Sequence, residues 1–371
     1  MLTRLDDYPI HQTPEPLAHG AGASLNQYDR YFFNGYNHDG SLYFGCALGY
    51  YPNRRVMDAA FAVLRDGEVV SVIASRRAPL DPIETQVGPI KVAIEEPMQR
   101  FRITVDPNEA GVEADVVFTS RTAAIEEPRY TLRSGAVTSF DYTRLTQWGA
   151  WSGNVSVDGE EHQIVPSEHV GCRDRSWGVR PVGQQPPGEG VEPQFFWLWA
   201  PLWFDDCCVH FDVNEYGDGR QWHFVGAHIP LLGSPEEAVP GADSTVTWAS
   251  AVEHSIKWQP GTRWSESADI RLHMHNAESI DIHLEPLATF QMRGLGYLHP
   301  EWGHGHWQGE LEVHAERWRV ADTNPMDPFY LHVQQLVRAT WGDRVGVGVF
   351  EQIVLGAYGP YGFTGLFDGA P

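Results

Sequence analysis

The chain has 371 residues, and its 26 lysines and arginines against 49 aspartates and glutamates give a formal net charge of -23. That length is sufficient for two domains that each bury a core. The negative charge repels phosphate backbones and anionic lipid surfaces, so it argues against nucleic-acid binding. We therefore expect no nucleic-acid partner.

The beginning of the chain and its cysteines indicate a cytoplasmic protein. Met1 to Asp7 has early acidic residues and no apolar run, unlike a secretory signal. No apolar window approaches the ~20 residues that a membrane-spanning helix needs. Four cysteines, with Cys207 and Cys208 adjacent, do not form a disulfide framework and suit a reducing compartment. Cys172 or Cys208 could act as a nucleophile, but the pattern favours buried apolar packing.

Aromatic residues are unusually frequent. The chain has 14 Trp, 14 Tyr and 17 Phe, together 12% of its residues. This content suits thick packing between sheets, or the wall of a cavity that holds a large apolar ligand.

Short alternating runs follow an irregular start at residues 1–27, and almost no stretch keeps a helical period for three turns. Asp66-Gly67 and Asp158-Gly159 lie between such runs and predict hairpins. The pattern is typical of an all-β protein. The strands expected in this half are Tyr31–Asn34, Ser41–Tyr50, Val56–Leu64, Val69–Ser75, Ile90–Ile94, Phe101–Val105, Ala114–Ser120 and Val137–Thr143.

A segment rich in proline and glycine, Val182 to Pro193, predicts a domain boundary near residue 185. We expect one domain over residues 1–185 and a second over residues 186–371. A helix is a competing interpretation near residue 333, but the Gly342-Asp343 turn favours a hairpin. The strands expected after the boundary are Gln194–Ala200, Cys207–Glu215, Gln221–Ile229, Thr245–Ile256, Ala268–Met274, Ser279–Leu284, Thr289–Gly294, Leu331–Trp341 and Val345–Leu355.

Two segments repeat a pattern of tryptophan and glycine. Trp148 to Val157 and Trp302 to Val313 both contain Trp-Gly and then Trp-x-Gly-x-aliphatic-x-Val. We interpret the match as a sign of two similar barrels in tandem.

The stretch from Gly171 to Pro181 concentrates charged and aromatic residues. In an extended chain, Arg173, Arg175 and Trp177 point to one face, and Asp174 points to the other. An aspartate that faces an apolar cavity can keep a raised pKa and act as an acid. The competing interpretation is a structural network of Arg and Asp at a domain junction.

Asp174-Arg175-Ser176-Trp177-Gly178, preceded by Gly171, resembles the Asp-His-Asn/Gln-Trp-Gly signature of carotenoid 1,2-hydratase-like proteins. That superfamily includes AttH-like bacterial proteins, and the chain is most similar to its uncharacterised bacterial members. The resemblance implies two tandem lipocalin-like (calycin-type) antiparallel β-barrels with a ligand cavity near their junction. It also implies cofactor-free chemistry of the hydratase, lyase or isomerase type on a terpenoid, polyene or aromatic lipid. The chain departs from the signature at two positions, with Arg175 in place of His and Ser176 in place of Asn or Gln.

The resemblance suggests a site around Asp174. Asp174 would protonate an alkene or enone, and the faces of Trp177 and Trp199 would stabilise the cation. His304, in a glycine-rich turn with Glu301, would position water or remove the second proton. The residues expected in the site are Asp174, His304, Glu301 and Tyr297 for catalysis, and Arg173, Trp177, Trp197, Trp199 and His306 for substrate binding.

Two alternatives come from other classes of protein. One is a barrel that binds a hydrophobic ligand and performs no reaction. The other is a cupin-like metal enzyme, because His304-x-His306-x3-Glu310 has the spacing of such a ligand set.

Further motifs are weak or lacking. Asp205-Asp206 and Asp212 could form an acid pair with His210, although Asp205 and Asp206 better suit a polar connection between strands. The sequence has no glycine-rich phosphate cradle, no Gly-x-Ser-x-Gly elbow and no Cys-x-x-Cys. We therefore expect no cofactor and no bound metal.

Overall fold

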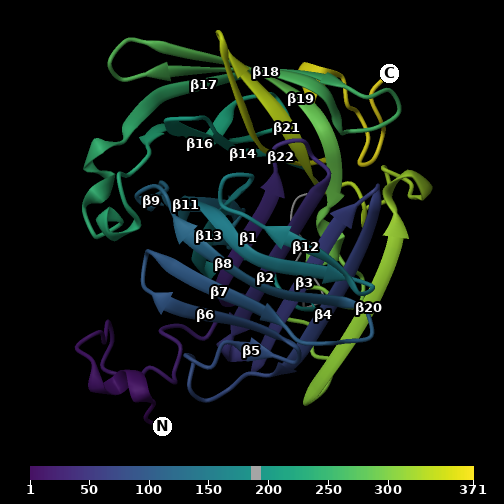
Figure 1. The fold of residues 1–371 in the computed structure, drawn as a ribbon. Helices are drawn as coiled ribbons and strands as arrows, with labels where there is room; N and C mark the ends of the chain where they lie inside the picture. The colour runs from purple at the N-terminus through teal and green to yellow at the C-terminus, as the bar shows by residue number, and fades with distance from the viewer. Residues whose placement is uncertain (185–193) are drawn as a thin grey trace.

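The computed structural model describes residues 1–184 and 194–371, with the side chain of Ser134 excepted. Nearly all regular structure is antiparallel strand, arranged as two barrels that pack against each other (Figure 1). This confirms the all-β, two-barrel expectation. The boundary expected near residue 185 lies in a segment outside the described residues, so it stays a prediction.

The first barrel is a curved sheet of 14 strands whose main path runs β20-β4-β3-β2-β1-β13-β11-β8-β7-β6-β5. Its two edges come close together. A Cβ added to Gly88, just after β5, would lie only 3.1 Å from the Val313 side chain of β20. The strands are β1 (Gln27–Asn37), β2 (Leu42–Tyr51), β3 (Val56–Arg65), β4 (Glu68–Arg77), β5 (Gln86–Val87), β6 (Ile90–Glu96), β7 (Arg100–Val105), β8 (Val112–Ser120), β9 (Ile125–Glu126), β10 (Tyr130–Ser134), β11 (Val137–Val157), β12 (Glu160–Ile164), β13 (His169–Val179) and β20 (Leu311–Arg319).

The second barrel is closed and contains β14 (Phe195–Trp203), β15 (Cys207–Glu215), β16 (Gln221–Pro230), β17 (Thr247–Trp258), β18 (Ser265–Met274), β19 (Ser279–Gln291), β21 (Val333–Trp341) and β22 (Arg344–Leu355). Short 3-10 turns connect the strands: η1 (Arg4–Asp7), η2 (Pro52–Arg54), η3 (Pro235–Glu237), η4 (Ala242–Thr245), η5 (Met292–Leu295), η6 (Val320–Asp322) and η7 (Gly359–Tyr361). Within residues 1–184 and 194–371, no helix has the length and apolarity needed to cross a bilayer.

The C-terminal hairpin is confirmed, but one boundary between strands is wrong. β21 and β22 pair along their length around the turn at Gly342, whose φ is +58°. Ser279–Leu284 and Thr289–Gly294, expected as two strands, form the single strand β19 with η5 after it. β19 continues through Pro286 because the register with β21 shifts there, and such a bulge tolerates a residue that has no N–H to donate.

The repeated tryptophan pattern does not mark equivalent strands of two barrels. Trp148 to Val157 lies inside β11, whereas Trp302 to Val313 spans a turn and the start of β20. β20 pairs with β4, so both segments belong to the first barrel. The interpretation of this match as a duplicated element is therefore wrong.

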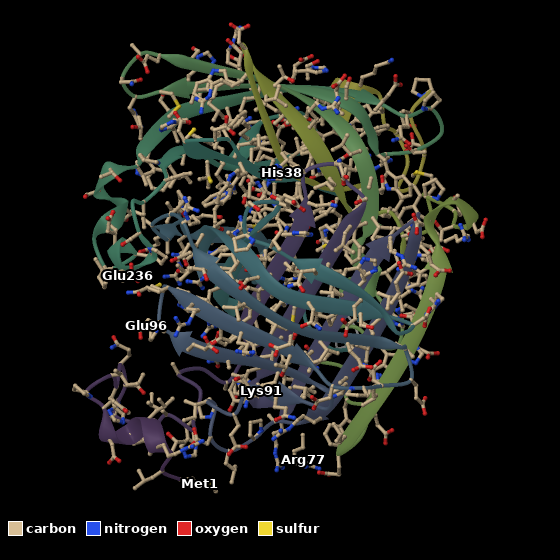
Figure 2. The ribbon with its side chains drawn as sticks, viewed as in Figure 1. Met1, His38, Arg77, Lys91, Glu96 and Glu236 are labelled. Atoms are coloured by element: carbon tan, nitrogen blue, oxygen red, sulfur yellow. The ribbon has the colours of Figure 1, made fainter. Side chains whose placement is uncertain are left out.

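Apolar side chains of the described residues form three large clusters and a smaller one, because neighbouring residues of a strand face opposite ways. Phe33 lies in the core of the first barrel and Leu198 in that of the second. Their neighbours Phe32 and Trp199 lie in a third cluster between the barrels. Side chains from both barrels are directed into the region where the barrels meet (Figure 2). Strands with two apolar faces explain the high aromatic content.

Candidate active site

Asp174 faces the junction of the two barrels. β13 pairs with β1 on one side and β11 on the other, and Asp174 is directly opposite Phe32 of β1. The Phe32 ring lies edge-on to Trp199 of β14, with their centroids 6.3 Å apart. The strand alternation therefore aims Asp174 at the second barrel, on the face opposite to Arg173 and Arg175.

The two neighbouring guanidiniums do not bind Asp174. Arg173 donates from Nε to the Gln147 side-chain oxygen at 2.8 Å, and Arg175 pairs with Asp29. Among the described residues, none donates a hydrogen bond to the Asp174 carboxyl group, which is half-buried. The interpretation of this stretch as a structural network of Arg and Asp is therefore wrong for Asp174.

Burial raises the pKa of Asp174 to about 7. The charges of Arg144 and Arg30 pull this pKa down, whereas Glu127 and Glu351 push it up. Near neutral pH a large fraction of Asp174 thus keeps its proton, as a general acid requires.

A buried polar cluster joins the barrels beside Asp174. Arg144 of β11 donates from Nε to Glu127 Oε2 at 2.7 Å and also pairs with Asp212 of β15. Trp197 donates from Nε1 to Asp212 Oδ1 at 2.8 Å, and His210 Nε2 lies 3.1 Å from Glu127 Oε1. Of the predicted acid pair, His210 and Asp212 therefore lie in this cluster.

A second cluster comes from β21, β22 and the residues just before β21. His332 Nε2 lies 2.6 Å from Glu351 Oε1, and the other carboxylate oxygen of Glu351 accepts from Gln334 at 2.6 Å. Because Glu351 also accepts from Gln334, we assign the hydrogen of this contact to His332 Nε2, and a neutral ring then keeps a lone pair on Nδ1. This Nδ1 is buried and has no hydrogen-bond partner in the described parts of the chain. The His332 ring lies 4.9 Å from Tyr297 and 6.1 Å from Trp197.

His304 lies at the junction but is poorly suited to act as a base. Its Nε2 lies 2.8 Å from the Leu295 carbonyl oxygen, and its Nδ1 lies 3.0 Å from Arg30 Nη1. Burial, with the charges of Arg30 and Arg180, lowers the pKa of His304 well below its usual value. Both ring nitrogens are thus occupied, so the structure does not support the predicted role of His304.

Tyr297 lies within the site. Its ring packs against His304 at 4.6 Å as well as against His332, and burial raises its pKa to about 12. The negative charge of Asp174 contributes to this raised pKa, which places the two side chains near each other.

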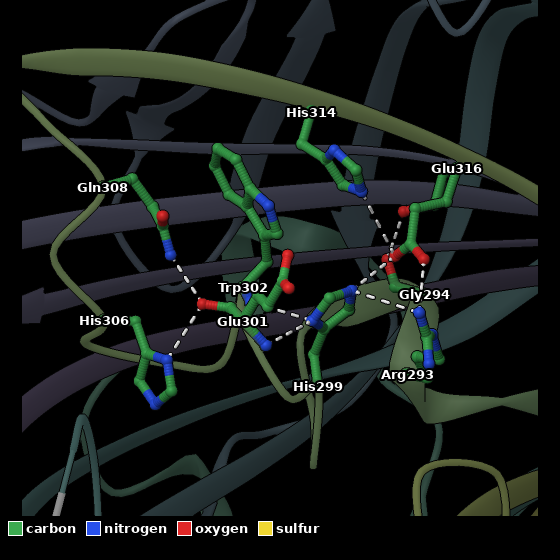
Figure 3. A network of polar contacts seen from close by, with 10 residues as sticks. Arg293, Gly294, His299, Glu301, Trp302, His306, Gln308, His314 and Glu316 are labelled. Atoms are coloured by element: carbon green, nitrogen blue, oxygen red, sulfur yellow. Dashed lines mark hydrogen bonds and ion pairs between the residues drawn. The ribbon is translucent and has the colours of Figure 1, made fainter.

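Three other predicted residues lie elsewhere. Trp177 is 42% exposed and lies on the face of β13 opposite to Asp174, because the two are three positions apart on an alternating strand. Glu301 is exposed, and its backbone oxygen accepts from His306 Nδ1 at 2.9 Å (Figure 3). The structure therefore does not bring Trp177, Glu301 or His306 to Asp174.

The predicted metal set is not assembled. Glu310 is exposed and accepts from Arg77 Nε at 2.8 Å, whereas His304 is enclosed between Arg30 and Leu295. His304, His306 and Glu310 each have another partner, so the geometry contradicts the cupin-like alternative.

A different trio, His299, His314 and Glu316, has its candidate ligand atoms within 4.8 Å of one another (Figure 3). His299 Nδ1 accepts from two backbone N–H groups at 3.1 and 2.8 Å, so its hydrogen sits on Nε2 and points at Glu316. Arg293 already donates to Glu316 at 2.7 Å. A metal would need the Nε2 lone pair and would compete with this guanidinium. The donor set therefore fits an ion-pair network that fastens the turn to β20.

The chain belongs to a family of unknown function (DUF8625), which matches residues 2–364. No curated protein matches the sequence. A crystal structure of a putative AttH from Nitrosomonas europaea matches with a TM-score of 0.53 at 14% identity, over 93% of this chain and 98% of that one. Kievitone hydratase from Nectria haematococca matches with a TM-score of 0.50 at 12% identity, over 95% and 96%. CghA with Sch210972 matches with a TM-score of 0.50 at 11% identity, over 90% and 89%.

These likenesses show a common fold. They confirm the fold that the resemblance of the mid-chain motif implied, two tandem antiparallel β-barrels. Several residues near Asp174 were not predicted from the sequence, namely the charged Arg30, Glu127, Arg144 and Glu351, together with His332, which contacts Glu351. One sequence signal could have identified some of them. A charged residue inside an otherwise apolar strand, such as Glu351 in β22, indicates a buried polar group that needs partners.

Proposed function

We propose that this protein is a cofactor-free acid/base enzyme, of the hydratase, lyase or isomerase type, that acts on a hydrophobic small molecule. The observation that carries this proposal is Asp174. Its carboxyl group has a pKa of about 7, lies near an aromatic wall that includes Trp199, and has no hydrogen-bond donor among the described residues. The fold shared with kievitone hydratase, which is a hydratase by name, supports the reaction type.

In the first step, the O–H bond of Asp174 breaks and its proton bonds to one alkene carbon. The π electrons form the new C–H bond and leave positive charge on the neighbouring carbon. The indole rings of Trp197 and Trp199 stabilise that charge. Trp177, expected earlier in this role, is replaced because it lies on the other face of β13.

His332 takes the second proton. In hydration, a lone pair of water forms the C–O bond, and a water proton moves to His332 Nδ1. In isomerisation, the same nitrogen takes a proton from the adjacent C–H bond, whose electrons form the shifted double bond. Glu351 supports His332 through Nε2, in the arrangement of a base held by a carboxylate. Exchange with solvent returns the proton to Asp174.

The expected location stays cytoplasmic. Cys46, Cys172, Cys207 and Cys208 are buried free thiols, which supports a reducing compartment.

The test is solvent isotope incorporation. The small molecule that co-purifies with the protein is identified by mass spectrometry, and alkenes of that class are then incubated with the protein in D2O. The wild type should place deuterium on carbon. Asp174→Asn should abolish incorporation and leave ligand affinity within about twofold, because the amide keeps the shape of the carboxyl group but cannot protonate an alkene.

His332→Gln should reduce product formation by about 100-fold, within the usual range for loss of a general base. His254→Gln is the matched control, because His254 also pairs with a carboxylate, Glu215 at 2.9 Å, but faces the core of the second barrel and binds Tyr361 through Nδ1. Tight binding without deuterium incorporation would identify a carrier, and a stoichiometric transition metal would contradict cofactor-free chemistry.

A further inference from the structure

Two arginines at the junction lack the carboxylate partner that a buried guanidinium normally needs. Arg30 is 2% exposed, and Arg180 is half-buried at the end of β13. Neither forms an ion pair with any residue in the described parts of the chain, and the Nε of each is buried without a partner there. An unpaired buried cation is costly, so a site that keeps two is suited to an anion.

Arg30 has one side free. Its Nη1 and Nη2 lie 3.0 and 2.9 Å from the two ring nitrogens of His304. A neutral imidazole has only one acceptor nitrogen, and His304 Nε2 is occupied by its contact with the Leu295 oxygen. Arg30 can therefore donate only from Nη1 to His304, which leaves Nε and Nη2 without an acceptor. These two groups form the edge that binds a carboxylate through two parallel hydrogen bonds.

Arg180 lies near the same Tyr297 ring as Arg30. The Cζ atoms of Arg30 and Arg180 are 4.3 and 5.9 Å from the centroid of the Tyr297 ring. Arg180 also lies 5.5 Å from the Tyr28 ring, but no acceptor among residues 1–184 and 194–371 binds its guanidinium. Both guanidiniums thus lie within 6 Å of the centre of one phenol ring, Tyr297.

The Tyr297 hydroxyl supplies a third donor. A phenol whose pKa is raised to about 12 keeps its hydrogen at neutral pH. Within the described residues, this hydroxyl has no hydrogen-bond partner. Arg30, Arg180 and Tyr297 together offer only donors, and they lie beside Asp174.

We propose that Arg30, Arg180 and Tyr297 bind the anionic group of an amphipathic ligand, a carboxylate or similar oxyanion, whose apolar body lies against Trp197 and Trp199. This inference rests on the proposed function for the location of the site and narrows its substrate class to acidic hydrophobic molecules. It requires no turnover.

The neighbouring carboxyl groups in residues 1–184 and 194–371 do not form ion pairs with Arg30 or Arg180. Asp174 feels the charge of Arg30, but within the described residues it accepts no hydrogen bond from either arginine. Asp58 lies close enough to Arg30 to feel its charge, but its carboxylate accepts from the Gly305 N–H at 2.6 Å and from Tyr51 at 3.2 Å. Arg173 also lacks a carboxylate within the described chain, but it lies on the opposite face of β13 and donates to Gln147.

The test uses two fluorescent probes that share one skeleton. 1-Anilinonaphthalene-8-sulfonate carries an anionic group, and N-phenyl-1-naphthylamine is the same molecule without it. At pH 7.5 the wild type should bind the sulfonate at least about 10-fold more tightly than the neutral amine, through charge-assisted hydrogen bonds. Arg180→Gln should remove most of this preference and change affinity for the neutral amine little. Arg180→Lys should restore part of it.

Arg129→Gln is the control for net charge, because Arg129 is an exposed arginine paired with Asp141. It should keep the preference of the wild type. Tyr297→Phe, which removes a donor and no charge, should weaken sulfonate binding alone. Equal affinity of the wild type for both probes, or an unchanged preference in Arg180→Gln, would overturn the proposal.

The two proposals fail in different ways. If the preference for the anion holds and no alkene takes up deuterium, the protein is a carrier of acidic lipids and only the catalytic proposal falls. If deuterium is incorporated and the probes bind equally, only the anion site falls.

Discussion

At the scale of single residues, the environment of Asp174 differs sharply from that of its neighbours on β13. Arg173 and Arg175 find partners inside the first barrel, whereas Asp174 faces the second barrel without a hydrogen-bond donor among the described residues. Its carboxyl group therefore loses hydration and receives little in exchange, which favours the protonated form. The same isolation that makes Asp174 an acid also destabilises the folded chain at high pH.

This cost predicts how Asp174→Asn changes stability with pH. The pKa of Asp174 is about 7 in the folded chain, against an ordinary value of 3.8. The unfolded chain releases this proton first, so between about pH 4 and pH 7 the wild type loses stability as pH rises, and the loss is complete above pH 7. Each pKa unit corresponds to about 1.4 kcal/mol. Allowing for partial solvent access, we expect Asp174→Asn to gain about 1–3 kcal/mol relative to wild type between pH 4 and pH 8.

Urea unfolding at both pH values measures this gain. The exposed Asp205→Asn serves as the control and should show no such trend. A gain that is the same at pH 4 and pH 8 would show that the Asp174 carboxyl group titrates normally.

At the scale of elements, the approach of β1 to β13 depends on Gly171. The ladder is interrupted between the pairs Phe33–Arg173 and Tyr36–Val170, and the Asn34 side chain accepts the Cys172 N–H at 2.9 Å instead. A Cβ on Gly171 would lie 2.0 Å from the Asn34 backbone oxygen, closer than real atoms approach. Only glycine therefore allows the two strands to meet here, three residues before Asp174.

Gly171→Ala should accordingly separate β1 from β13. We expect a loss of about 1–3 kcal/mol in the free energy of unfolding, the usual range for overpacking in a core. Chemical denaturation measures it. Gly22→Ala is the matched control, because the nearest atom to its added Cβ is 3.8 Å away, and it should stay within about 0.5 kcal/mol of wild type. A neutral effect of Gly171→Ala would mean that the strands can shift to accept a side chain.

At the scale of the whole molecule, the two barrels are tied together in two ways. β20, which lies between strands of the second barrel in sequence, completes the first sheet by pairing with β4 (Figure 1). The apolar cluster between the barrels includes Phe290 of β19, whose ring stacks on Tyr43 of β2 at 4.5 Å. Neither barrel keeps all its partners when the other unfolds.

We therefore expect one cooperative unfolding transition. Tryptophan fluorescence and far-UV circular dichroism in urea should give coincident curves. Phe290→Ala should shift the entire curve to lower urea concentration. The free energy of unfolding should fall by about 3–5 kcal/mol, as for other large truncations in a core. Two separate transitions, or a shift in only one of them, would show that the barrels fold independently.

The sequence by itself determined the all-β class, most strands and the opposite facing of Asp174 and Arg173. These features are local, because the two-residue period of a strand and the chemistry of its turns act over a few neighbouring residues. The motif around Asp174 also indicated the two-barrel fold.

Only the tertiary structure decided which groups meet Asp174. Arg144, His332 and Glu351 reach the junction from strands far apart in sequence, and the pairing of β20 with β4 depends on a free edge distant in the chain. His304 and Trp177 have side chains of the expected type, but neither can act with Asp174. Both ring nitrogens of His304 are occupied, and Trp177 lies on the opposite face of β13. Contacts of this kind depend on how two curved sheets pack, which no local pattern of residues specifies.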